Sequence, residues 1–231
     1  MATKDHQSEP IESASETLQR IFDGHGSVLG SQMADESSRY DVLKKTDFPK
    51  PQRTRRIAVA NQKGGVGKTT STVNTAAALA NKGAQVLVID MDPQGNASTA
   101  LGVSHASGET SVYDVIEGRS DLGDVITVCP DFPTLDVVPA SIDLSGAELE
   151  VADLPNRNTL LKEALDLYLR QSDKHYDYVF IDCPPSLGLL VINAMCAVTE
   201  MLIPIQAEYY ALEGLGQLIN TIGLVQEHFN P

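Results

Sequence analysis

The chain has 231 residues and a formal net charge of −14, and its composition is 42% hydrophobic but only 5% aromatic, with no tryptophan. A balance this acidic argues against a general nucleic-acid-binding protein, and no apolar run reaches the length of a membrane-spanning helix. The polar and acidic start of the chain lacks the features of a secretory signal peptide. We therefore expect a cytoplasmic protein that does not act at a membrane.

Residues 1–53 are rich in Ser, Glu, Asp and Gln and carry few large apolar side chains. A segment of this composition cannot bury enough apolar surface to fold alone, so we predict a largely disordered acidic extension. Residues 13–21 could form a short amphipathic helix within it. The extension fits either a solvated tail or a segment that docks to a partner. We predict that the folded domain covers residues 54–231.

A strand, a glycine-rich loop and a helix follow this boundary. Residues 57–60 are an apolar run typical of a buried strand, and residues 69–80 place their apolar side chains on one helical face. Glycines let backbone N–H groups close on a phosphate, and the helix N-terminus adds the positive end of its dipole. We predict that Lys68 reaches the β- and γ-phosphates and that the Thr69 hydroxyl binds Mg²⁺. The predicted nucleotide-binding residues are Lys63, Gly64, Gly65, Val66, Gly67, Lys68, Thr69 and Thr70.

The spacing of this loop departs from the standard pattern G-x-x-x-x-G-K-[ST] at one position. Gln62 stands where the pattern has glycine, and an additional lysine, Lys63, stands at the front of the loop. An ordinary glycine-rich turn would not explain the Lys-Thr pair before a helix. The pattern G-x-G-x-x-G of hydride-transfer enzymes is absent, as are a nucleophile elbow and a zinc signature. No C-x-x-C spacing occurs, and we expect buried thiols in a reducing compartment at Cys129, Cys183 and Cys196.

Strands and helices alternate through the rest of the chain. We predict further strands at residues 85–90, 134–139, 177–182 and 200–205. We predict further helices at residues 111–116, 158–170, 189–197 and 212–229. Apolar strands that alternate with helices predict an α/β fold, with a mainly parallel β-sheet flanked by helices on both faces.

Carboxylates follow two of these strands. Asp90 and Asp92 lie at the end of strand 85–90, and Asp182 ends strand 177–182. The carboxyl ends of parallel strands form the crevice in which open α/β sheets bind ligands. We predict that Asp182 binds Mg²⁺ through a water and that Asp92 positions the attacking water, while Asp90 organises either the metal shell or the loop. Each carboxylate could instead cap a helix N-terminus.

Taken together, the motifs resemble those of the ParA/MinD superfamily of ATPases. The loop looks like a deviant Walker A motif, and the segment that ends in Asp182 and its prolines looks like a Walker B motif. The segment around Asp92 and the residues that follow strand 200–205 are similar to the ParA/Soj chromosome-partitioning branch rather than to MinD. The resemblance is carried by residues 63–70, 90–98, 180–186 and 204–214.

The resemblance implies an ATP- and Mg²⁺-dependent ATP hydrolase that is weak and is stimulated by DNA and a ParB-like partner. ATP would bring two subunits face to face, with Lys63 reaching the phosphates of the partner's nucleotide. This homodimer would bind DNA without sequence preference, on the nucleoid, and would serve chromosome or plasmid segregation. The implied catalytic residues are Lys63, Lys68, Asp92 and Asp182. The implied metal-binding residues are Thr69, Asp90 and Asp182.

Family members usually continue beyond the point where this chain stops, so the chain looks truncated at its C-terminus, with most of the DNA-binding surface expected in the missing part. Two alternatives remain. A MinD-like membrane-positioning ATPase would need a basic amphipathic C-terminal helix, and residues 212–229 lack a basic face. The other alternative is a truncated, non-catalytic interaction module that docks to a partner without turnover.

Overall fold

The computed structural model describes residues 28–46, 48–207 and 211–230, and the predicted helix at residues 13–21 lies outside them. The chain divides into two compact units, residues 1–49 and residues 50–231. The first contains α2 (Val28–Lys45), a helix that the sequence analysis did not predict because its apolar residues do not follow a helical period. The predicted boundary after residue 53 remains a prediction.

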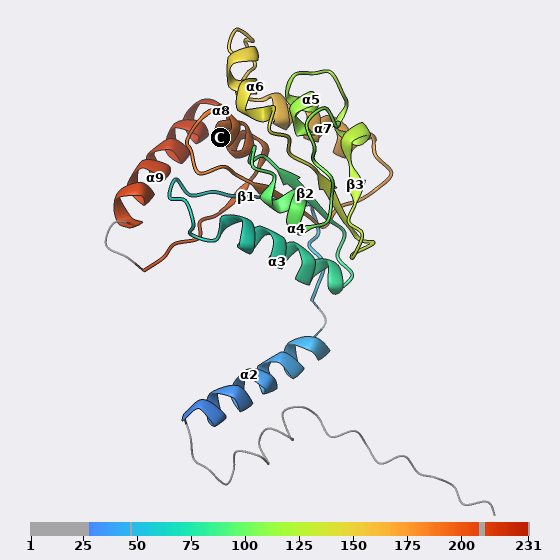
Figure 1. Cartoon of the computed structure of the whole chain (residues 1–231), viewed down its shortest axis with the longest axis vertical. Coiled ribbons are helices and arrows are strands. Elements are labelled where there is room, and N and C mark those ends of the chain that lie inside the picture. Colours follow the sequence, from blue (N-terminus) through green and yellow to red (C-terminus); the bar gives the residue numbers. More distant parts are fainter. Residues whose placement is uncertain (1–27, 47, 208–210, 231) are drawn as a thin grey trace, which may run out of the picture. The chain divides into compact units, whose positions relative to one another are not determined.

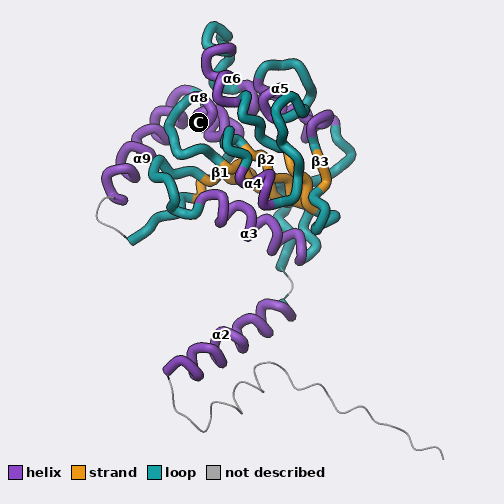
Figure 2. The backbone as a smooth tube through the Cα atoms, in the orientation of Figure 1, coloured by secondary structure: helices purple, strands orange, loops and turns teal. Residues whose placement is uncertain are grey.

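The second unit is built on one sheet, drawn in orange in Figure 2. The strand order is β3-β4-β2-β5-β1-β6. Its strands are β1 (Arg55–Val59), β2 (Val86–Asp90), β3 (Thr127–Val128), β4 (Leu135–Val138), β5 (Tyr178–Asp182) and β6 (Glu200–Leu202). Every pair is parallel except β3 with β4. The predicted mainly parallel sheet is confirmed. Strand β6 is shorter than predicted, and Pro204, which has no N–H to donate, follows it closely.

Helices cover both faces of this sheet (Figure 1). The helices are α3 (Lys68–Asn81), α4 (Asn96–Ala100), α5 (Val112–Ile116), α6 (Leu144–Glu150), α7 (Leu160–Gln171), α8 (Leu189–Ala197) and α9 (Ala211–His228), with a short 3-10 helix at Leu122–Val125. The predicted helices correspond to α3, α5, α7, α8 and α9. The short elements α4 and α6 were not predicted, because five to seven residues carry too little periodic signal.

Strand β2 shows why its sequence is apolar at successive positions. Val86 and Val88 belong to a hydrophobic cluster shared with α3 on one face, whereas Leu87 and Ile89 belong to a second cluster shared with α5, α7 and α8 on the other. Successive side chains of a strand point to opposite faces, so a strand covered on both sides must be apolar throughout. The predicted burial of the cysteines is also confirmed, since all three are buried free thiols.

The strand order brings three functional segments to one edge of the sheet. Strand β5 lies between β2 and β1. Asp182, the last residue of β5, is in register with Asp90 on one side and Val59 on the other. The loops that leave β1, β2 and β5 therefore start at the same level and share one crevice. Among the described residues, no helix combines the length and the apolar character that a bilayer crossing requires.

Candidate functional site

The loop between β1 and α3 has the backbone of an anion cradle. Gly65 and Gly67 have φ angles of 73° and 92°, a left-handed conformation that residues with a Cβ rarely adopt. Gly67 immediately precedes α3 and, having no side chain, cannot cap it. The N–H groups of the first turn of α3 therefore remain directed at the space in front of the loop, where the helix dipole favours a negative charge.

Lys68 carries the positive charge of this cradle. Its side chain is buried, with only 7% of the residue exposed, and its Nζ donates a long hydrogen bond of 3.4 Å to the carbonyl of Lys63. Burial lowers the pKa of Lys68, against the opposing effect of the carboxylates of Asp182 and Asp92. A cation that has lost much of its hydration gains strongly from an arriving anion.

Asp182 lies beneath the cradle and is fully buried. Its two oxygens accept hydrogen bonds from the hydroxyls of Thr69 (2.7 Å) and Thr72 (2.8 Å). Burial raises the pKa of Asp182 to about 6; the two threonine hydroxyls lower it, and nearby Asp90 and Asp92 raise it further. Because the Thr69 hydroxyl donates its hydrogen bond to Asp182, the lone pairs of the Thr69 oxygen are left to bind a cation in the cavity.

The carboxylate of Asp90 accepts hydrogen bonds from other groups of the protein. Its Oδ2 accepts the backbone N–H (2.8 Å) and the hydroxyl (2.7 Å) of Ser98, and its Oδ1 accepts the N–H of Asp92 (3.2 Å). Burial raises the pKa of Asp90 to about 6, with the Ser98 hydrogen bonds opposing this effect. Ser98 lies in the first turn of α4, so Asp90 acts as a helix cap and organises the loop. These contacts favour that predicted alternative over a place among metal ligands.

Asp92 faces the open space of the site. Its Oδ1 accepts the N–H of Gln94 (3.1 Å), and its carbonyl accepts the N–H of Gly95 (2.9 Å). Asp92 lines a cavity of about 500 Å³. The residues around this cavity are Gly64, Gly65, Gly67, Lys68, Thr69, Thr70, Asp92, Gln94, Asn96 and Pro185. Asp182 is not among them and meets the cavity through Thr69.

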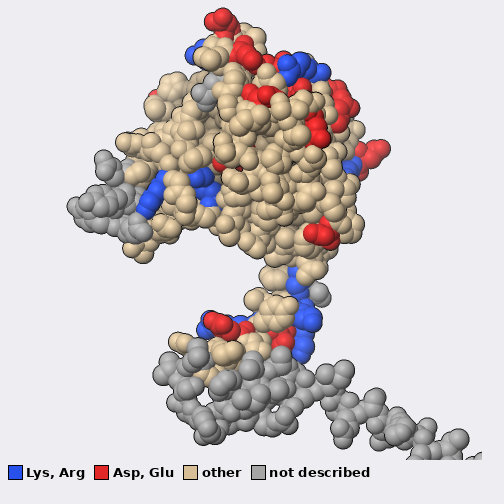
Figure 3. All heavy atoms as spheres, viewed as in Figure 1, with Lys and Arg blue, Asp and Glu red and all other residues tan. Residues whose placement is uncertain are grey.

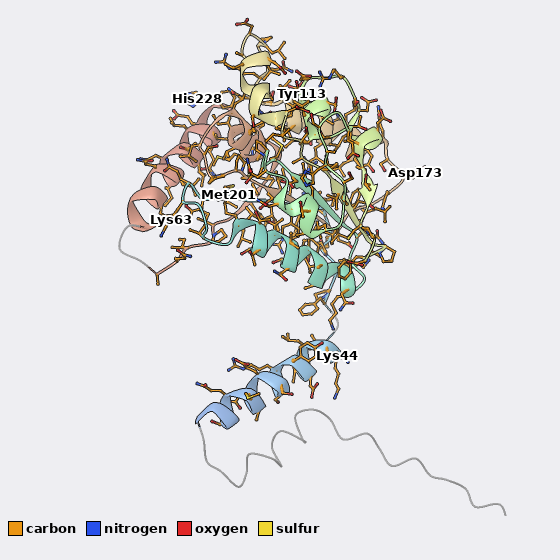
Figure 4. All side chains as sticks on the ribbon, in the orientation of Figure 1. Lys44, Lys63, Tyr113, Asp173, Met201 and His228 are labelled. Atoms are coloured by element: carbon orange, nitrogen blue, oxygen red, sulfur yellow. The ribbon has the colours of Figure 1, made fainter. Side chains whose placement is uncertain are left out.

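Two residues of the predicted loop set, Lys63 and Val66, do not line the cavity. Val66 is buried. The Nζ of Lys63 lies 3.4 Å from Oε1 of Gln206, beside the segment that follows β6 (Figure 4). The amide of Gln206 donates in turn to the carbonyl of Gly65 (3.2 Å), and buried Asn61 donates to the carbonyl of Pro204 (2.8 Å).

The structure adds four residues to the site that the sequence analysis did not single out: Thr72, Ser98, Asn61 and Gln206. Thr72 could have been found, because it lies one helical turn after Thr69 and shares its face of α3. The other three are visible only once distant segments are brought together.

The groups of this site that could hold a cation are the Thr69 hydroxyl oxygen and the Asp182 carboxylate. Within the described ranges, no three His, Cys, Asp or Glu side chains form a ready metal cluster. Oxygen donors such as Thr69 and Asp182 suit Mg²⁺, which keeps several waters and is usually held by one or two protein oxygens together with phosphate oxygens. On the face of the second unit that Figure 3 shows, most acidic side chains lie over the α5–α6 end, and a few lie elsewhere.

Comparison with known proteins agrees with this geometry. A family model described as an AAA domain matches residues 54–231. The sporulation initiation inhibitor protein Soj of Bacillus subtilis is 52% identical over 174 residues, which are 75% of this chain and 67% of that protein. The chromosome partitioning protein ParA of Caulobacter vibrioides is 48% identical over 175 residues, which are 76% of this chain and 64% of that protein.

A solved structure shares the fold. Cobyrinic acid a,c-diamide synthase from Mycobacterium smegmatis, with a bound ATP analogue and magnesium, superposes with a TM-score of 0.71 at 40% identity, over 77% of this chain and 68% of that one. The chain thus spans about two thirds of the length of the proteins it matches. With its glycine loop, its paired strand-end carboxylates and these relatives, the chain belongs to the AAA domain family and, within it, to the ParA/Soj partitioning ATPases.

Proposed function

We propose that this chain binds ATP with Mg²⁺ and hydrolyses it slowly, in a cycle that drives chromosome or plasmid segregation. One observation carries the proposal. Lys68 and Thr69 begin the helix that follows β1, and Asp182 and Asp92 stand at the ends of the neighbouring strands β5 and β2. Lys68, Thr69 and Asp92 line one cavity, and Asp182 is bonded to Thr69. The ATP analogue and magnesium in the M. smegmatis relative support the choice of ligand.

Each residue has a proposed part in this chemistry. The glycine loop and Lys68 bind the β- and γ-phosphates, and they orient the γ-phosphate toward Asp92. Thr69 would hold Mg²⁺ directly, and Asp182 would hold it through a water. When bound, the ion would neutralise the negative charge that develops on the phosphate oxygens. Asp92 positions the attacking water, and no covalent intermediate with the protein is needed.

ATP binding is proposed to close two subunits face to face, and Lys63 to reach the phosphates of the partner's nucleotide. Its side chain lies next to Gln206 and outside the lining of its own cavity, which supports this role. The dimer binds DNA without sequence preference in the cytoplasm, on the nucleoid. A ParB-like protein stimulates hydrolysis and releases it.

Turnover in the presence of the proposed partners tests this function. Phosphate release from ATP should be slow for the chain alone and should rise when DNA and a ParB-like protein are added together. Omitting Mg²⁺ should remove it. Tight ATP binding without any phosphate release under all these conditions would instead identify a non-catalytic interaction module.

Lys63→Ala should separate nucleotide binding from dimer formation. We expect this variant to bind ATP with an affinity close to that of the unaltered chain, because Lys63 does not line its own cavity. It should remain monomeric when ATP is added, as measured by light scattering. The matched control is Lys82→Ala, which removes an exposed lysine just after α3. ATP-dependent dimers of the Lys63 variant would show that the crossing lysine is not required.

A further inference from the structure

The imidazole of His105 lies directly against the turn that carries Asp92. If Gly95 had a Cβ, that atom would be 2.5 Å from Nδ1 and 2.6 Å from Cε1 of His105. A real Cβ does not approach a non-bonded heavy atom this closely, so the ring fills the space that a side chain at position 95 would need. Gly95 also has a φ of 62°, a left-handed conformation suited to glycine. The sequence therefore places its smallest residue where the histidine ring packs.

His105 is itself held on two sides. Its Nε2 lies 2.8 Å from the hydroxyl of Thr99 on α4. The residues on either side of His105 are bonded to Glu109, whose Oε2 accepts hydrogen bonds from the hydroxyl of Ser104 (2.6 Å) and the N–H of Ala106 (3.1 Å). These hydrogen bonds lower the pKa of Glu109, the Ser104 hydroxyl having the largest effect. The ring is thus fixed by α4 and by the turn at residues 104–109.

The segment under the ring is the one that positions Asp92. Gly95 donates its N–H to the carbonyl of Asp92 (2.9 Å), which closes the turn. Gln94 donates its backbone N–H to the Asp92 carboxylate (3.1 Å), and both residues line the cavity. If Gly95 moved away from Asp92 and toward the position of the ring, the carbonyl of Asp92 would lose its hydrogen bond from Gly95. The imidazole stands in the path of that movement.

We propose that His105 is a positioning residue for ATP hydrolysis: it packs on Gly95 and so fixes the turn that aims Asp92 at the attacking water. The inference rests on the proposed function, in which Asp92 governs turnover. His105 acts through Gly95 and is not among the residues that line the cavity. Its loss should therefore reduce turnover while leaving the grip of Lys68 and the glycine loop on the phosphates intact.

Three substitutions separate the packing of the His105 ring on Gly95 from its hydrogen bond to Thr99. His105→Ala removes the ring and its hydrogen bond. His105→Phe keeps a flat ring over Gly95 but loses the hydrogen bond to Thr99. The control His175→Ala removes an exposed histidine from the segment that precedes β5. We expect His105→Ala to lower kcat about 10- to 100-fold, since a displacement of about 1 Å costs that much, with the Kd for ATP changed less than about twofold. His105→Phe should recover most of kcat.

A second readout does not require turnover. In the absence of nucleotide, hydrogen exchange at the amides of Gly95 and Ser98 should be faster in His105→Ala than in the unaltered chain. It should be unchanged in His175→Ala. Both variants should melt at the same temperature as the unaltered chain. Wild-type exchange rates in His105→Ala would overturn the inference, and so would wild-type kcat. If the unaltered chain hydrolyses no ATP, the proposed function fails. If the unaltered chain does hydrolyse ATP and hydrogen exchange in His105→Ala is unchanged, only the role of His105 fails.

Discussion

Lys68→Ala should bind ATP at least about a hundredfold more weakly than the unaltered chain. Hydrogen bonds to charged groups are each worth about 1.5–3 kcal/mol, and about 1.4 kcal/mol corresponds to a factor of ten in affinity. Lys68 is the buried cation of the cradle, so two such bonds to phosphate oxygens account for the predicted loss. Isothermal titration calorimetry with ATP and Mg²⁺ measures it.

The comparison that makes this result specific is Lys63→Ala, which should retain binding. Thermal unfolding of Lys68→Ala should show an intact fold, because the substitution removes a buried charge with one long hydrogen bond to a backbone carbonyl. An affinity for ATP equal to that of the unaltered chain would remove Lys68 from the binding site.

Asp92→Ala should bind ATP normally but hydrolyse it at least about a hundredfold more slowly, which is the usual range for the loss of a group that handles the proton or the water in the transition state. The carboxylate lines the cavity but is not part of the glycine loop or its helix. The ATP-bound form should accumulate as a dimer, which light scattering with ATP detects alongside phosphate release.

Asp131→Ala provides the control for Asp92→Ala. Asp131 is an exposed carboxylate in the turn between β3 and β4, and its removal should change neither binding nor hydrolysis. Hydrolysis at the normal rate in the Asp92 variant would mean that another group holds the attacking water.

The sequence predicted those strands and helices whose apolar residues follow a clear pattern over consecutive positions. Continuous apolar runs marked β2 and β5 because helices cover both of their faces. Strand β3 escaped prediction because it has two exposed residues and is defined only by its pairing with β4. Helix α4 escaped because it is held by a hydrogen bond from Ser98 to Asp90 rather than by an apolar stripe.

The same division applies to the site. Lys68, Thr69 and Asp182 stand in motifs with a recognisable spacing, and in the structure they lie close together, while the role of each stays a prediction. The two possible roles of Asp90 could not be separated without knowing where Ser98 lies. Gln206 is 143 positions from Lys63 along the chain. Contacts over such a separation depend on strand order, which local pattern does not encode.

The hydrogen bonds from Asn61 to Pro204 and from Gln206 to Gly65 have a mechanical consequence. They join the front of the glycine loop to the stretch that leaves β6. Displacing either segment alone breaks both bonds, at a cost of about 1 kcal/mol each. The glycine loop and the stretch that leaves β6 are therefore coupled: moving one by more than a hydrogen-bond length either carries the other with it or costs about 2 kcal/mol.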